Sequence, residues 1–239
     1  MNKTRAEAEA FAKESVELLK LASANNIDIG VAPTFLSLCK VRKTNPELTV
    51  AAQNVHYEDH GAFTGEVSVP MLLDLGVTWC LVGHSERRTY FAETSRTCNK
   101  KLKVLVANKM TPIYCVGETL EEFEAGKTKK VIEEQIKVGL NGLTSEEVKG
   151  IVIAYEPVWS IGTGKNASTE IAEDICGYIR ELVREGFGEI AEEVRILYGG
   201  SVKPENVRAY LSEKDVDGAL VGGASLKVDS FRALIENII

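Results

Sequence analysis

Residues 151–159 read IVIAYEPVW. The first five of them, Ile151–Tyr155, are apolar or aromatic, which is typical of a strand buried on both faces of a parallel sheet. Glu156 follows at once, and Pro157 and Trp159 stand beside it. A carboxylate at the end of an apolar strand is a candidate general base. This stretch therefore predicts a core strand with a functional acid at its C-terminal end.

Strand-like and helix-like segments alternate on both sides of this stretch. Amphipathic helical periodicity is clear in Lys129–Leu140 and Glu170–Glu185, and Thr4 and Glu7 form a capping box that opens the first helix. The alternation predicts one α/β domain, residues 1–239, with a parallel sheet inside and helices outside. We count seven strands and eight outer helices. The six further strands are Ile27–Ala32, Thr49–Ala52, Thr78–Val82, Thr111–Val116, Arg195–Tyr198 and Gly218–Val221.

The composition excludes several classes of protein. The chain has 239 residues, 44% hydrophobic and 26% charged, which is typical of a folded globular protein and not of a disordered or disulfide-stapled one. Its net charge of −7 argues against a nucleic-acid surface, and no apolar run reaches the ~20 residues of a membrane span. The first residues do not read as a secretory signal. We expect a cytoplasmic protein, because its five cysteines are widely spaced and lack metal-binding spacing: Cys39, Cys80, Cys98, Cys115 and Cys176.

In α/β barrels, chemistry lies on the loops that follow the C-terminal ends of the strands. His84 lies in such a loop, in the sequence GHSERR of residues 83–88. A single histidine is more often structural than catalytic. Ser85 is a good helix cap, however, and a ring near a helix N-terminus is expected to stay neutral. His84 is therefore a candidate electrophile.

Three other loops are candidates for binding. Residues 56–68 form a long loop, which is either an interface or a floppy surface excursion. Residues 162–164, Gly-x-Gly, follow Glu156 and are either part of a lid or a plain turn. Glycine pairs follow the last two strands, at 199–200 and 222–223. Such pairs either expose backbone amides to a phosphate or only relieve crowding, and two pairs in successive loops favour a phosphate site.

Eight motifs in one order resemble the triosephosphate isomerase family, over residues 2–239. The resemblance implies an α/β TIM (β/α)8 barrel. The motifs are AAQN at 51–54, GAFTGE at 61–66, GHSERR at 83–88, CVGET at 115–119, AYEPVW at 154–159, IGTGK at 161–165, YGGSV at 198–202 and LVGGAS at 220–225.

The resemblance implies interconversion of dihydroxyacetone phosphate and D-glyceraldehyde 3-phosphate through an enediolate, in glycolysis and gluconeogenesis, with no cofactor or metal. By the known assignments for this family, Glu156 would be the base and neutral His84 would polarise the carbonyl. Residues 157–167 would form the lid. Phosphate would be held by the backbone of Gly162, Ser201, Gly222 and Gly223, and the supporting residues would be Glu86, Cys115, Thr64 and Ser85.

The N-terminus departs from the family pattern. The family begins with a strand that ends in Asn-x-Lys, and its lysine points into the pocket. Lys3 matches the residue before the first helix and not that lysine. We therefore expect the first strand of the barrel to be missing, Met1 to be an internal methionine of a longer protein, and this chain to be weakly active or inactive.

The loop at residues 56–68 implies a homodimer, because in the family it docks into the neighbouring subunit and Thr64 reaches the partner's site. The expected ligand is a triose phosphate, with no nucleic-acid or membrane partner. Two alternatives to the isomerase remain open: a phosphate-binding barrel without turnover, and an inactive truncated form.

Overall fold

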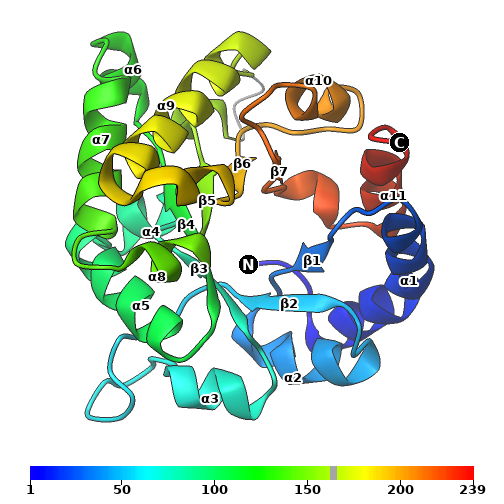
Figure 1. Ribbon diagram of the computed structural model, residues 1–239. Coiled ribbons are helices and arrows are strands. Elements are labelled where there is room, and N and C mark those ends of the chain that lie inside the picture. The colour runs from blue at the N-terminus through cyan, green and yellow to red at the C-terminus, as the bar shows by residue number, and fades with distance from the viewer. Residues whose placement is uncertain (162–165) are drawn as a thin grey trace.

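Seven parallel strands form one sheet in chain order, β1-β2-β3-β4-β5-β6-β7. The structure is a computed structural model, and it describes residues 1–161 and 166–239. Figure 1 shows the strands arranged around the centre of the molecule, with the helices outside them. The predicted count of seven strands is confirmed in this part of the chain. The strands are β1 (Gly30–Val31), β2 (Thr49–Ala52), β3 (Trp79–Val82), β4 (Thr111–Val116), β5 (Val152–Tyr155), β6 (Ile196–Tyr198) and β7 (Gly218–Ala219).

The two edge strands are shorter than predicted. Residues 27–32 and 218–221 read as strands of six and four residues, but β1 and β7 have two residues each. The sheet order gives each of them one neighbour, whereas β4 pairs with β3 and with β5 over its length. A strand is defined by its ladder of hydrogen bonds, so a missing neighbour shortens it although its apolar pattern continues.

The described chain contains eleven α-helices, three more than the eight predicted. Five of the eleven have only five or six residues, too few to show a helical period in the sequence. The capping box at Thr4 and Glu7 is confirmed. The α-helices are α1 (Arg5–Ala24), α2 (Phe35–Thr44), α3 (Val69–Asp74), α4 (Ser85–Tyr90), α5 (Ser95–Ala107), α6 (Leu120–Glu124), α7 (Thr128–Gly139), α8 (Ser145–Lys149), α9 (Thr169–Phe187), α10 (Val207–Leu211) and α11 (Val228–Glu236). The 3-10 helices are η1 (Val158–Ser160), η2 (Gly188–Glu192) and η3 (Gly223–Ser225).

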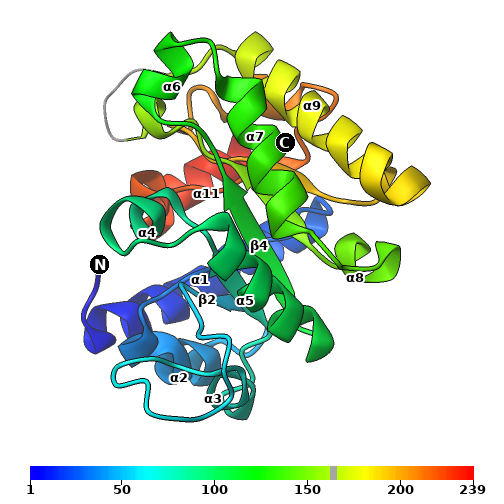
Figure 2. The same ribbon diagram turned by 90° about the vertical axis from the view of Figure 1, so that its left-hand side faces the viewer.

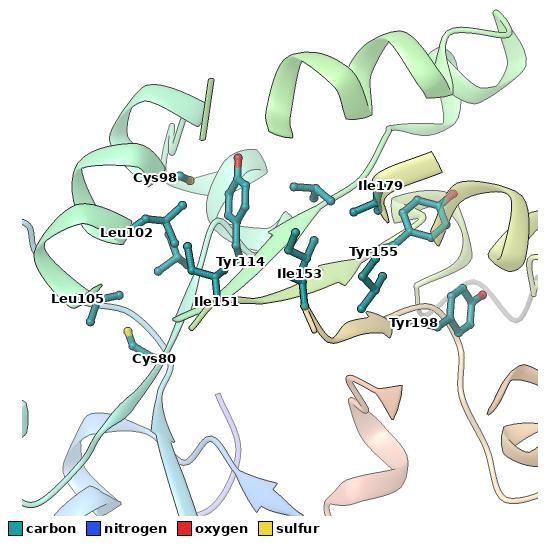
Figure 3. Packing of buried hydrophobic residues seen from close by; sticks show 14 of the residues in the cluster. Cys80, Cys98, Leu102, Leu105, Tyr114, Ile151, Ile153, Tyr155, Ile179 and Tyr198 are labelled. Carbon is teal, nitrogen blue, oxygen red and sulfur yellow. The ribbon is translucent and has the colours of Figure 1, made fainter. Parts of the chain in front are cut away.

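The main core lies between the sheet and the outer helices. Leu102 and Leu105 of α5 pack there with Tyr114 of β4, and all three side chains are fully buried (Figure 3). The hydroxyl of Tyr114 donates to the carbonyl of Gln135 in α7 at 2.6 Å, so its polar end is satisfied inside the core. This packing fixes α5 and α7 against the strands that carry the candidate site.

All strands run in the same direction, so their C-terminal ends meet at one edge of the sheet. The loops after β3, β5, β6 and β7 therefore come together there. Figure 2 shows the long strand β4 running beneath α5 and α7 towards this edge. No helix in the described part of the chain is long and apolar enough to cross a membrane.

Candidate active site

His84 and Glu156 form a hydrogen-bonded pair at the C-terminal ends of β3 and β5. The ring Nε2 lies 2.9 Å from Oε1 of Glu156. The other carboxylate oxygen, Oε2, accepts the backbone N–H of Ser85 at 2.9 Å. Glu156 is 2% exposed, so both of its oxygens find partners within the protein although it is almost completely buried. The structure thus brings together the predicted base, the predicted electrophile and the supporting residue Ser85.

Two glycines make room for Glu156. A Cβ atom on Gly117, after β4, would lie 1.8 Å from the carbonyl oxygen of Glu156. A Cβ on Gly199, after β6, would lie 2.9 Å from its Cγ. The backbone is bonded on both sides here, because the Glu156 N–H donates to Val116 at 2.7 Å and the Gly199 N–H donates to Tyr155 at 2.7 Å. The flanking strands therefore hold the carboxylate in place, and the two glycines permit this close approach.

His84 caps α4 with its own ring. Its Nδ1 accepts the backbone N–H of Glu86 at 3.3 Å, which leaves the proton of a neutral ring on Nε2, facing Glu156. The sequence predicts that the helix N-terminus disfavours the imidazolium form of His84. The net shift of the His84 pKa in the structure has the opposite direction. Burial lowers the pKa of His84, but the hydrogen bond and charge of Glu156, together with the charges of Glu86 and Glu93, outweigh it, so the pKa is raised above its ordinary value.

Replacing Glu156 with Gln is expected to lower the pKa of His84, because the charge that raises it is removed while the burial remains. The measurement is an NMR titration of the imidazole resonances in the wild type and in Glu156→Gln. The exposed His60 is the internal control in the same spectra. An unchanged His84 titration would show that the pair does not govern its protonation.

Two predicted supporting residues lie beside the pair. Cys115 is fully buried on β4, and burial together with the charge of Glu156 raises the pKa of its thiol. It therefore stays a neutral packing group. Glu86 places its Oε2 3.8 Å from Nδ1 of His84, but its side chain is 69% exposed. Glu86 thus adjoins the histidine from the solvent side.

The predicted phosphate-binding residues follow β6 and β7. The pairing of Tyr198 with Ala219 places these two strand ends side by side. Ser201 is half-buried after β6, and Gly222 and Gly223 are exposed after β7. The exposed glycine backbone leaves its amides open to a ligand. Gly162 and most of the IGTGK motif lie outside the described residues.

Thr64 makes no hydrogen bond with His84 or Glu156 in the part of the chain that the structure describes. It lies in the loop at residues 56–68, where positions 58–66 are all exposed. The loop is nevertheless held together by its own contacts. The N–H of His56 donates to Val67 at 2.8 Å, and the rings of His56 and Phe63 lie 4.4 Å apart.

The start of the predicted lid is anchored by Glu118, which the sequence reading did not single out. Its Oε1 accepts the indole N–H of Trp159 at 2.8 Å and the hydroxyl of Tyr155 at 3.2 Å. Phe123 stacks on the Trp159 ring at 4.3 Å. Burial raises the pKa of Glu118, which is 0% exposed. The sequence signal that could have identified Glu118 is its position two residues after the end of β4.

A buried charged cluster lies behind His84, and it too was missed. Glu93 is 7% exposed, and its Oε2 accepts Arg87 at 2.6 Å and Lys101 at 2.8 Å. Lys101 also donates to Asn54 at 2.7 Å. Nothing in the sequence around Glu93 distinguishes it from a surface acid. No group of three or more His, Cys, Asp or Glu side chains in residues 1–161 and 166–239 is arranged to hold a metal ion.

Comparison with known proteins agrees with this arrangement. The family model described as triosephosphate isomerase matches residues 1–238. A triosephosphate isomerase of Carboxydothermus hydrogenoformans is 50% identical over 242 residues, covering 100% of this chain and 96% of the relative. Those of Lactococcus lactis and Streptococcus mutans are 51% and 53% identical, each covering 99% of this chain and 94% of the relative. The fold class predicted from the sequence, a TIM barrel, is thereby confirmed. The chain belongs to the triosephosphate isomerase family.

Proposed function

We propose that this chain interconverts dihydroxyacetone phosphate and D-glyceraldehyde 3-phosphate, as a step of glycolysis and gluconeogenesis. The observation that carries the proposal is the pair of His84 and Glu156 at the ends of β3 and β5. Glu156 takes a proton from the carbon next to the carbonyl and returns it to the neighbouring carbon. His84 donates a hydrogen bond from Nε2 to the carbonyl oxygen on which negative charge develops, and it moves a proton from the substrate's hydroxyl oxygen to that oxygen while the enediolate is present. The established chemistry of the family supports these roles.

The phosphate group is held by backbone amides of Ser201, Gly222 and Gly223, together with Gly162. Their position after β6 and β7 supports this role, because the loops after the last two strands are a recurrent phosphate site in barrels. Glu86, Cys115 and Ser85 support the catalytic pair. The family resemblance supports residues 157–167 as the lid that excludes water from the substrate, although residues 162–165 of this segment lie outside the described residues.

A coupled assay of triose-phosphate interconversion tests this function. It is combined with calorimetric titration of a phosphate-bearing enediolate mimic. Turnover supports the isomerase. Binding without turnover supports the phosphate-binding barrel. If neither turnover nor binding is found, the inactive truncated form is supported. The three relatives named above are called triosephosphate isomerases, so they do not favour the second or third outcome.

We further propose that two copies associate through the loop at residues 56–68. Positions 58–66 are exposed in an ordered loop, and Phe63 is 42% exposed at its tip. An aromatic side chain on a compact, protruding loop is suited to a pocket in another molecule. Thr64 lies next to it and would reach the partner's active site.

Replacing Phe63 with Asp is expected to shift the protein from dimer to monomer, because a charge would have to be buried in the interface. Sedimentation velocity at micromolar concentration measures the shift. Asp59→Asn is the control on the same loop, since it changes an exposed residue by one charge. A wild-type protein that sediments only as folded monomer would contradict the proposal.

We place the protein in the cytoplasm as a single domain of residues 1–239. All five cysteines are free, which suits a reducing compartment. One seven-stranded sheet and one large core cluster support a single domain.

A further inference from the structure

We propose that Arg88 is a positioning residue for His84, acting through the carbonyl group of Gly83. This inference rests on the proposed function of His84. Arg88 lies in α4, one turn after His84, and its side chain is half-buried. Its Nε donates to the carbonyl oxygen of Gly83 at 2.8 Å. That carbonyl belongs to the peptide group that joins Gly83 to His84, so Arg88 holds the backbone plane from which the catalytic ring projects.

The other polar group of Gly83 is held as well. Its N–H donates to Oε1 of Glu93 at 2.9 Å. Glu93 in turn is fixed by Arg87 and Lys101 through its second oxygen. Both backbone groups of one glycine are thus bonded to charged side chains, and hydrogen bonds to charged groups are stronger than those between neutral ones.

Gly83 needs such restraint. Its φ of +75° lies in the left-handed region, and a Cβ atom there would come within 3.0 Å of three neighbouring groups. Glycine is required for this conformation, but glycine is also free to leave it. The side chains of Arg88 and Glu93 supply the conformational restraint that a glycine, which has no side chain, lacks.

Arg88 also connects His84 to the strand beside Glu156. Its Nη2 donates to the carbonyl of Cys115 on β4 at 3.1 Å. The next carbonyl on β4, that of Val116, accepts the N–H of Glu156. One guanidinium group therefore spans the end of β3 and the end of β4. A lysine offers a single ammonium and has no planar fork with which to repeat both bonds.

The test compares Arg88→Lys with the wild-type protein. The expected result is a kcat lower by about tenfold or more with KM changed by less than about twofold, because the histidine is displaced while substrate binding is kept. The ¹⁵N resonances of the His84 ring should shift or broaden in the same variant. Arg96→Lys is the control, since Arg96 is exposed at the start of α5, and its kcat should equal that of the wild type.

A second variant, Arg88→Ala, is tested for rescue. Added guanidinium ion should restore part of its kcat and should leave Arg96→Ala unchanged, whereas a merely structural loss would not be rescued. Wild-type kcat together with unshifted His84 resonances in Arg88→Lys would overturn the proposal. So would a loss of kcat that follows the folded fraction measured by circular dichroism. If the wild type shows no turnover, the proposed function fails, while the His84 resonances still decide the role of Arg88.

Discussion

Shortening Glu156 to Asp is expected to lower kcat by about a hundredfold or more, with a much smaller change in substrate affinity. The carboxylate would be about one ångström short of the substrate carbon, since the side chain loses one methylene group. It could not compensate by moving its backbone, because the N–H of Glu156 is bonded to Val116 and Gly199 packs against its Cγ. The measurement is kcat in the coupled assay.

The control for this variant is Glu146→Asp. Glu146 is exposed in α8, before the start of β5, and so lies at the opposite end of the strand from Glu156. Its kcat should equal that of the wild type. Calorimetry with the enediolate mimic should still detect binding to Glu156→Asp. Unchanged turnover in that variant would remove Glu156 from the role of base.

Replacing Arg180 with Met is expected to lower the free energy of unfolding by about 3–5 kcal/mol. Arg180 in α9 is 5% exposed and bonds Asp215 and Asp217. It also donates to the carbonyl groups of Ala191 and Val194 at 2.8 and 3.0 Å. Methionine fills a similar volume but leaves a buried carboxylate and two carbonyl groups without their donor.

Arg184→Met is the matched control on the same helix. Arg184 lies one turn later and pairs with Glu192, but both side chains are largely exposed. Exposed ion pairs contribute about 1 kcal/mol or less. In a chain of this size 1 kcal/mol corresponds to about 2–4 °C in Tm, so thermal unfolding should separate the two variants clearly. Equal Tm values would show that the buried pair does not stabilise the fold.

The local pattern of apolar and polar residues was sufficient to predict most of the fold. The five inner strands, β2 to β6, were predicted within one residue at each end, because a strand buried on both faces needs a short continuous apolar run. The edge strands and the short helices were not predicted well. The extent of an edge strand depends on its one neighbouring strand, and a short helix has only one or two turns. Neither feature leaves a period in the sequence.

Some residues of the candidate site could likewise be predicted from the sequence, and others could not. Glu156 and His84 could be named from the sequence, since Glu156 follows an apolar strand directly, His84 follows one after a single glycine, and the parallel sheet brings strand ends together. The buried Glu93 was not found, because an acid on the surface and an acid paired with Arg87 and Lys101 look alike in one dimension. Its partners come from separate segments of the chain.

The sequence by itself determined the order of the strands, the edge of the sheet at which the candidate site lies, and the pair of residues, His84 and Glu156, that meets there. Only the tertiary structure decided how those residues are held and charged. The pKa of His84 is the example: its place before a helix predicts a neutral ring, yet the buried carboxylate of Glu156, 2.9 Å away, raises the pKa. Electrostatic energy depends on distance through space and on burial, and residues 72 positions apart in the chain acquire both only when the strands pack together.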